Sequence, residues 1–284
     1  MKIDRSAYAM PLCLLSALLA TASVALADGA PLPNYTPSEL VKQANAPISS
    51  MLQVRFQDLY SPAWHGVAGQ GNAFGISVTA PFPEFRLLPV AQLSLLRIPA
   101  VLTFPTQPTG FGDLSLVDLP VLRASHNFVA GVGPILVFPT ATVPALGQGK
   151  WQAGPAASAA WSTREWLIGV LVENPISFAG DPSRLAVNQM YVQPFLSVGL
   201  GGGWFLRSEP QMIIDWETHQ QLLPIDLGFG RVFNIGRQSV SAFIEPGWTI
   251  AYDGPAPRYS ISFNFVLLYP DFWIHNASFF NSSN

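Results

Sequence analysis

The two faces of an extended chain from Lys150 to Ser162 differ in composition, and this difference predicts a membrane-spanning strand. One face carries Trp151, Ala153, Pro155, Ala157, Ala159 and Trp161, and the other carries Gln152, Gly154, Ala156, Ser158 and Ala160. Ten residues at about 3.3 Å each span about 33 Å, and a tilt near 45° reduces this to about 24 Å of height. That height matches the apolar band of a transmembrane β-barrel, which has aromatic rings at both boundaries.

The preceding apolar stretch could be mistaken for a membrane helix. No lysine, arginine, aspartate or glutamate occurs between Ala124 and Gly149, so a hydropathy window alone favours a helical span. Pro134, Pro139 and Pro144 argue against it, because each removes a helix hydrogen-bond donor and clashes with the preceding turn. The stretch is therefore read as extended chain.

The same alternation recurs along the chain from Ile48 onward and predicts about twelve strands. Gln53, Arg55 and Gln57, for example, alternate with apolar residues, polar side chains facing in and apolar ones out. After this first strand the expected runs are 73–82, 91–104, 112–125, 127–139, 150–162, 165–178, 187–201, 203–217, 221–234, 238–252 and 258–270. Ten or fourteen strands remain alternatives, and a soluble two-sheet sandwich would also show alternation.

The connections between the expected strands alternate in length, which favours an antiparallel up-and-down barrel with both termini on the periplasmic side. Tight turns are expected at 125–127, 162–165, 201–203 and 234–238, and longer loops at 60–72, 140–149, 179–186 and 253–257. The long connection 83–90 and the short one 218–220 depart from this rule.

The N-terminus has the features of a secretory signal peptide covering residues 1–27. Lys2 and Arg5 precede an uncharged apolar run, and Ala25-Leu26-Ala27 supplies small residues before the expected cleavage site. A retained anchor helix is the alternative. The only cysteine, Cys13, would be removed with the peptide, so the mature chain is expected to have neither a disulfide nor a cysteine metal site.

Residues 28–47 are expected to form a separate N-terminal segment with a short helix. Thr36-Pro37-Ser38-Glu39 has the pattern of a capping box with proline at the first helical position, and predicts a helix over Pro37–Asn45. This segment would plug the barrel lumen, lie at the periplasmic mouth, or form a mobile leader. The barrel itself is expected over residues 48–270, followed by a C-terminal tail at 271–284.

Composition supports an exported membrane protein. Only 11% of residues are charged, and the mean hydropathy is +0.31, high for a soluble enzyme. Fourteen basic against seventeen acidic residues give a net charge of −3, so no nucleic-acid footprint is present. An apolar exported chain without a helical span must pair its backbone groups in a closed barrel, and the Gram-negative outer membrane is the expected location.

Polar residues on the inward face are candidates for lining a solute path. They are Gln53, Arg55, Gln57, Asp113, Glu173, Gln189, Gln193, Arg207, Glu209, Gln211, Asp215, Asp226 and Glu245. The same residues would also suit a purely structural, salt-bridged interior, and the sequence does not separate the two interpretations. The aromatic residues expected at the lipid interfaces are Trp151, Trp161, Trp204, Trp216, Tyr259 and Tyr269.

No catalytic constellation is evident, and no enzyme activity, metal or cofactor is expected. The four histidines, at positions 65, 126, 219 and 275, fall in expected loops, turns or the tail. No GxSxG, HExxH or P-loop pattern occurs. A lipid-modifying barrel enzyme would require a serine or carboxylate bonded to one of these histidines at the rim.

Several segments resemble the meta-pathway phenol-degradation family of bacterial outer-membrane proteins, often labelled transporters. The similar segments are GFGDL at 110–114, GPILVFPTAT at 133–142, LGQGKWQAGPA at 146–156, SELVKQANAP at 38–47, SFAGD at 177–181 and VNQMYVQPF at 187–195. The resemblance covers about residues 37–270 and implies an outer-membrane β-barrel with a role in passive uptake of small, often aromatic, compounds. It brings no functional residues to transfer, and the tail after Pro270 departs from chains that end on the last strand.

The sequence therefore leads to one main hypothesis, a passive outer-membrane channel for small, aromatic or hydrophobic solutes. A structural or interaction barrel with a filled lumen is the second, and a lipid-modifying enzyme the third. Outer-membrane lipid, a small solute and the barrel assembly machinery are the expected partners. The oligomeric state stays open.

Overall fold

The structure, a computed structural model, describes residues 35–84, 89–105, 109–125 and 127–269. The predicted signal peptide, residues 28–34, the C-terminal tail, His126 and His275 lie outside the described residues. Within the described part of the chain, no helix is long and apolar enough to cross a membrane.

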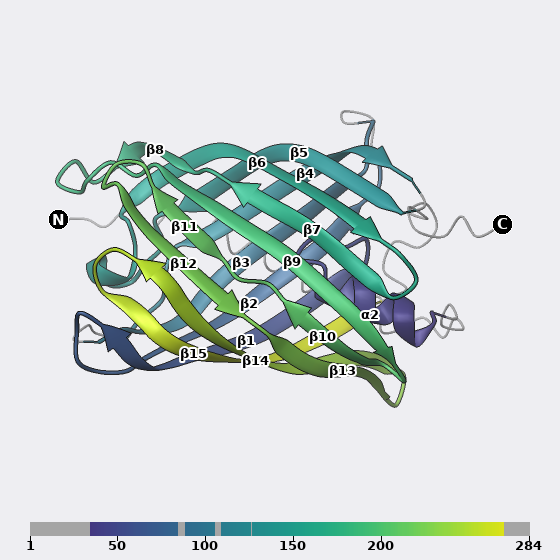
Figure 1. Ribbon diagram of the computed structural model, residues 1–284. Coiled ribbons are helices and arrows are strands. Elements are labelled where there is room, and N and C mark those ends of the chain that lie inside the picture. The colour runs from purple at the N-terminus through teal and green to yellow at the C-terminus, as the bar shows by residue number, and fades with distance from the viewer. Residues whose placement is uncertain (1–34, 85–88, 106–108, 126, 270–284) are drawn as a thin grey trace.

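The described chain is an antiparallel β-barrel closed by pairing of its first and last strands (Figure 1). The strands are β1 (Leu52–His65), β2 (Gly71–Phe82), β3 (Gln92–Thr103), β4 (Leu114–Ala124), β5 (Phe128–Phe138), β6 (Lys150–Ser162), β7 (Trp166–Glu173), β8 (Ile176–Gly180), β9 (Gln189–Gly201), β10 (Trp204–Ser208), β11 (Met212–Asp215), β12 (Gln220–Asp226), β13 (Gly228–Ile235), β14 (Gln238–Tyr252) and β15 (Ala256–Tyr269). Closure follows because β1 pairs with both β2 and β15, in register from Leu52↔Tyr269 to His65↔Ala256. A two-sheet sandwich is thereby excluded.

Three of the barrel strands are each interrupted once, so the fifteen described segments make twelve strands. β7 and β8 both pair with β6, β10 and β11 both pair with β9, and β12 and β13 both pair with β14. The prediction of a twelve-stranded, up-and-down barrel is confirmed, and the alternatives of ten and fourteen strands are wrong.

A structural feature accompanies each interruption. Asn174 and Pro175 separate β7 from β8, and proline cannot donate a ladder hydrogen bond. There the chain presses against β6 so closely that a Cβ on Gly154 would collide with the carbonyl oxygen of Asn174. The strand made of β10 and β11 pairs with the strand made of β12 and β13, and this pairing is interrupted once. At the interruption, the Asp226 carboxylate accepts a hydrogen bond from the Glu209 amide at 2.8 Å. A side chain thus replaces the missing backbone partner.

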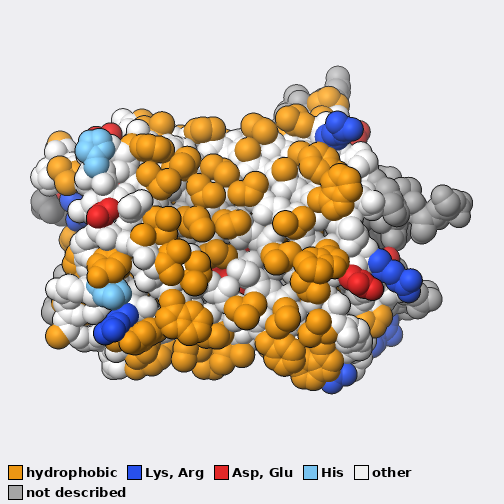
Figure 2. Space-filling model, viewed as in Figure 1, with side chains coloured by type: hydrophobic (Ala, Val, Ile, Leu, Met, Phe, Trp, Pro, Cys, Tyr) orange, Lys and Arg blue, Asp and Glu red, His pale blue; other side chains and the backbone are white. Residues whose placement is uncertain are grey.

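The outer surface of the barrel is an apolar belt with charged residues at its two ends (Figure 2). Trp151 and Trp161 lie on one face of β6 and are 42% and 52% exposed. Gln152, on the opposite face of the same strand, is 3% exposed. Ile168 and Phe263 on other strands are similarly exposed. Exposed large apolar side chains around a closed barrel are what a lipid-facing surface requires.

Two carboxylates depart from the apolar outer face. Asp58 pairs in register with the exposed Phe263, so it faces outward, where it accepts a hydrogen bond from Asn72 Nδ2 at 2.8 Å. Asp118 lies between the buried, inward-facing Val117 and Leu119, and accepts from Ser94 Oγ at 2.5 Å. Both belt carboxylates are partnered by a side chain of an adjacent strand.

The first loop is shorter than predicted, because β1 continues to His65. The expected loop 60–72 contracts to residues 66–70, and Pro62 is accommodated by a register shift between Tyr60 and Ala63. His65 is therefore the last residue of a strand, with its ring stacked on Tyr252 at 4.1 Å, and its placement in a loop was wrong. The predicted tight turn between β9 and β10 and the turn between β13 and β14 are present.

Among the described residues, helix α2 (Pro37–Asn45) precedes the barrel and matches the predicted bounds. The capping box is formed: Glu39 N donates to Thr36 Oγ1, and Thr36 N donates to the Glu39 carboxylate at 2.7 Å. Figure 1 shows α2 at the end of the barrel where the chain turns from β9 to β10 and from β13 to β14. This end is called the turn end below, and the opposite end the loop end.

Candidate functional site: the barrel interior

Ion pairs cross the interior of the barrel. Arg55 on β1 lies 3.2 Å from Glu209, which follows β10, although β13, β14 and β15 separate these strands around the wall. Arg97 on β3 makes a two-pronged contact with Glu173 on β7, with distances of 3.0 and 2.8 Å, across the interior from β3 to β7. Bidentate arginine–carboxylate contacts are geometrically specific, so the Arg97–Glu173 pair fixes how β3 and β7 face each other across the interior.

Arg207 is the centre of a buried polar network that also includes the N-terminal helix. Its side chain is 2% exposed; Nε donates to Glu245 at 3.0 Å, Nη1 donates to Asn45 Oδ1 at 3.0 Å, and Nη2 forms an ion pair with Glu209. The Glu209 carboxylate also accepts from Gln193 Nε2 at 2.8 Å. Buried charges require partners of this kind, because an unpaired one is strongly destabilising.

An aromatic ring also contacts Arg207 and Arg55. The guanidinium carbon of Arg207 lies 4.3 Å from the centroid of the Phe243 ring, and that of Arg55 lies 5.8 Å from it. A cation over a ring face is attracted by the ring quadrupole, and more strongly where water is excluded. Phe243 therefore joins the charged layer to the apolar cluster described next.

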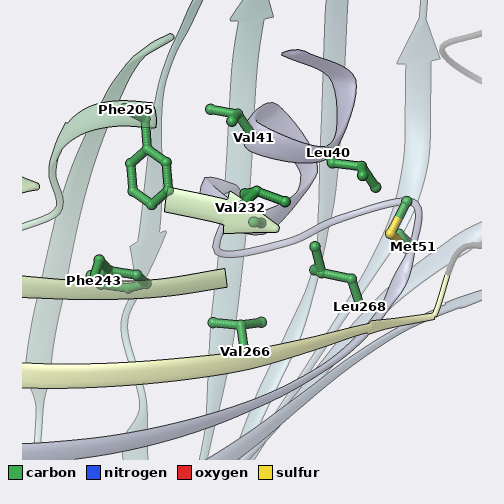
Figure 3. Close-up of a cluster of buried hydrophobic side chains, with 9 residues drawn as sticks. Leu40, Val41, Met51, Phe205, Val232, Phe243, Val266 and Leu268 are labelled. Carbon is green, nitrogen blue, oxygen red and sulfur yellow. The ribbon is translucent and has the colours of Figure 1, made fainter. Parts of the chain in front are cut away.

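Helix α2 is docked in the turn end by an apolar cluster (Figure 3). Leu40, Val41 and Ala44 of the helix are 7%, 3% and 0% exposed, and they pack with buried side chains of the barrel wall. The wall side of the cluster consists of Phe205, Val232, Phe243, Val266 and Leu268, with Met51 from the segment before β1. The interior at this end is thus occupied by helix and side chains.

Polar contacts also hold the N-terminal segment inside. Gln53 Nε2 donates to the Gln43 carbonyl oxygen at 2.6 Å, and Thr79 Oγ1 donates to the Pro47 carbonyl oxygen at 3.3 Å. Lys42 Nζ reaches the Thr163 carbonyl oxygen at 3.1 Å in the turn between β6 and β7. Burial lowers the pKa of Lys42 below its usual value of 10.5, and the nearby Glu39 opposes this shift.

A second apolar cluster covers part of the inner wall, where polar residues were expected. Leu95, Val117, Leu119, Ile135, Ala156 and Leu171 are buried together, with Ile48 of the N-terminal segment packed against them. The polar-in, apolar-out alternation expected on several strands does not describe this part of strands β3 to β7, where apolar side chains are buried. Alternation could not reveal this, because both faces of a strand such as β4 carry leucine and valine.

Most of the remaining predicted interior residues form hydrogen bonds with side chains or backbone groups of the barrel wall. Gln57 donates to Ser262 at 3.0 Å, and Gln189 donates to Asp215 at 2.8 Å. Asp226 accepts from Ser208 Oγ at 3.0 Å as well as from the Glu209 amide. Gln211 is exposed within the interruption between β10 and β11.

Asp113 holds a loop at the loop end. Its carboxylate accepts from the Ala141 amide at 3.0 Å and from the Gln148 amide at 2.7 Å, so it bridges both arms of the connection between β5 and β6. Arg184 in the next long loop donates to the carbonyl oxygens of Pro144, at 2.7 Å, and Gly147. The two long loops are thereby joined by charged side chains and backbone groups.

Asp181 orders the second of these loops. Its carboxylate accepts from both the amide and the hydroxyl of Ser183, at 2.9 and 2.7 Å. These hydrogen bonds hold the pKa of the Asp181 carboxyl below its usual value of 3.8. The loop-end mouth is therefore shaped mainly by carboxylates that accept from local donors.

The other predicted interface aromatics lie on the outer surface or its edges. Trp204, Trp216 and Tyr259 are 41%, 47% and 39% exposed, and Tyr269 is partly buried at the end of β15. Trp216 Nε1 donates to Asn174 Oδ1 at 3.0 Å. Their contact with the lipid boundary stays a prediction.

Sequence reasoning missed Arg97, although it forms one of the two ion pairs across the interior. The available signal was a single charged residue inside the apolar run 91–104, since a lone charge in a barrel strand is disfavoured on the lipid face.

The described residues do not form a recognisable catalytic or metal-binding arrangement. No group of three or more histidine, cysteine, aspartate or glutamate side chains suited to a metal ion occurs among them. His219 lies exposed in the turn between β11 and β12 with a positive φ of 56°.

Comparison with known proteins supports the fold. No protein-family model and no curated protein matches the sequence. Among solved structures, the COG4313 outer membrane channel from Pseudomonas putida F1 is similar, with a TM-score of 0.56 and 12% identity over 79% of this chain and 97% of that one. The NanC porin has a TM-score of 0.50 and 10% identity over 76% of this chain and 98% of that one. The chain therefore has the β-barrel fold that outer-membrane channels and porins share.

Proposed function

We propose that the protein is a passive channel of the Gram-negative outer membrane, whose path runs through the polar part of the barrel interior and is narrowed at the turn end by α2. The observation that carries this proposal is the layer of arginines and carboxylates inside an apolar-walled barrel. Polar side chains inside a barrel provide a hydrated route where the outer wall provides none.

The charge balance of this layer bears on the solute. Three arginines, Arg55, Arg97 and Arg207, face three glutamates, Glu173, Glu209 and Glu245, in the described ion pairs. Because these charges offset one another locally, the path does not favour strongly charged solutes of one sign. Small uncharged solutes fit it best. The apolar clusters beside the layer, and the resemblance to the phenol-degradation family, support solutes with an aromatic or hydrophobic part.

The N-terminal segment is the proposed restriction. The helix fills the turn end through Leu40, Val41 and Ala44, and Asn45 ties it to Arg207. A twelve-stranded barrel is intermediate between small barrels filled by side chains and large ones with an open channel. A helix in its mouth would therefore set the conductance.

The test is conductance of the mature chain in planar bilayers and solute-driven swelling of liposomes, beside a variant lacking residues 28–46. The expected result is a small conductance for the full chain and a several-fold larger one for the variant. Ile168→Ala, an apolar truncation on the outer surface, serves as control and should leave conductance unchanged. Two inert proteins, both folded as barrels, would overturn the proposal.

A structural barrel without a through-path is the second candidate. It is favoured by the same ion pairs, because Arg55–Glu209 and Arg97–Glu173 cross the interior and the clusters fill part of it. Inert full-length and shortened proteins would be its signature. A lipid-modifying enzyme has less support, since no described hydrogen bond joins a serine or carboxylate to His65 or His219.

A further inference from the structure

An aromatic groove lies on the outer surface of the barrel, away from the interior path. It has a volume of about 750 Å³ and spans the outer faces of β13, β14, β15, β1 and β2. Its lining includes Phe56, Phe229, Phe263 and Phe265, with Ala242 between them. The register explains the hollow. Ala242 pairs with Phe265 on one side, which in turn pairs with Phe56, and with Arg231 on the other, so a single methyl group stands between the rings and the cation.

A cation, Arg231, lines this groove between Phe229 and Phe233 on the outer face of β13. Arg231 pairs with Ala242 across the ladder, and its guanidinium lies 5.1 Å from the centroid of Trp204. Trp204 is itself stacked on Phe229 at 5.0 Å, which fixes the ring beneath the cation. Nε of Arg231 donates to the Gly202 carbonyl oxygen at 3.3 Å, and no described ion pair neutralises its charge.

Arg231 lies close to the turn end of the apolar belt. It pairs with Trp204, the first residue of β10, and its bonded carbonyl group belongs to Gly202 in the turn directly before that strand. Figure 2 shows basic side chains beside the belt at the turn end. A planar guanidinium with free donors binds phosphate well, and a cation stacked on tryptophan keeps its donors available.

We propose that the groove and Arg231 form a binding site for a glycerophospholipid of the leaflet at the turn end, with the phosphate on Arg231 and an acyl chain across Ala242. The apolar groove and the Arg231 cation are continuous, so one amphipathic molecule satisfies both. The one carboxylate in the groove, Asp58, is bonded to Asn72 and lies on the far side, across β14 and β15 from Arg231.

The test is native mass spectrometry of the detergent-solubilised mature protein titrated with phosphatidylglycerol. The expected result is a saturable adduct of one lipid. Arg231→Gln should weaken it about fivefold, the size expected for one arginine–phosphate contact at a membrane surface. Ala242→Phe places a ring in the groove where the acyl chain would lie, and it should abolish the adduct. Arg258→Gln is the matched control, because Arg258 stands over Tyr259 at 5.3 Å near the other end and should leave binding unchanged.

Three ligands separate the sources of affinity. Diacylglycerol with the same chains should bind at least fivefold more weakly than phosphatidylglycerol, and glycerol 3-phosphate should show no saturable adduct. Equal binding of diacylglycerol, or saturable binding of glycerol 3-phosphate alone, would overturn the proposal. Unchanged lipid binding by both Arg231→Gln and Ala242→Phe would also overturn it, with heat-modified gel mobility used to show that the variant barrels are folded. Formation of a dimer that excludes the lipid would overturn it as well.

Discussion

The two ends of the barrel are held by different physical interactions. At the turn end, Leu40, Val41 and Ala44 of α2 bury apolar surface against the wall, so the contact depends on area and shape. At the loop end, Asp113 and Arg184 hold the long loops through hydrogen bonds to backbone groups. The comparison indicates that the turn end should be destabilised by truncation of buried apolar side chains, whereas the loop end should be destabilised by removal of a single charged side chain. The Arg207 network lies between the two.

The largest effect is expected from Arg207→Met. The substitution leaves Glu209 and Glu245 buried without this partner, and breaking a buried pair in this way costs about 3–5 kcal/mol of unfolding free energy. Urea unfolding of the refolded barrel in lipid measures it. Arg258→Met, at an exposed arginine, is the control and should change the free energy by less than about 0.5 kcal/mol. An equal loss in both variants would contradict the central role of the network.

Leu40→Ala should loosen the turn end with little effect elsewhere. Truncating a buried leucine costs about 2–5 kcal/mol, and here the loss should reduce the free energy that holds α2 against the barrel wall. The expected result is faster hydrogen exchange of the helix amides and a higher conductance, with the amides of β5 and β6 unchanged. Ile168→Ala is the matched apolar truncation on the outer surface. Unchanged exchange in α2 would show that the helix is held by its polar contacts instead.

Asp113→Ala should open the loop end. It removes the acceptor for the amides of Ala141 and Gln148, and hydrogen bonds to a charged group contribute about 1.5–3 kcal/mol each when buried, less in this partly exposed site. Cleavage of the β5–β6 loop by a protease should become faster while barrel unfolding stays the same. The control is Glu217→Ala, an exposed carboxylate near the same end.

The smallest effect is a shift in acid sensitivity on Ser183→Ala. The pKa of Asp181 is depressed in the folded loop, so its contribution is full above its usual value of 3.8 and is lost as the pH falls through the lower folded value. Removing the Ser183 hydroxyl should move that loss to higher pH. An NMR titration of the Asp181 carboxyl measures it, and an unchanged pKa would show that the Ser183 hydroxyl does not contribute to the shift.

The features that the sequence predicted are those encoded locally. The period of two along β6 sets which residues face out, and the Thr36–Glu39 capping box marks the start of α2, so strand number and helix bounds follow from neighbours in the chain.

Other features depend on distant parts of the chain. The partner of Glu173 is Arg97, 76 residues away, and the cluster of Leu95 and Val117 is covered by Ile48 of the N-terminal segment. The strand interruption at Pro210 depends on Asp226 supplying an acceptor from the next strand. No local pattern carries that information.

Six residues, Ala46 to Met51, connect α2 to β1. Fully extended, they reach about 20 Å. If α2 dissociated from the barrel wall, this linker would keep it within about 20 Å of the start of β1. Its rebinding would therefore be a unimolecular step with a high effective concentration. Blocking and unblocking at this mouth would then proceed at rates independent of how many copies the membrane holds.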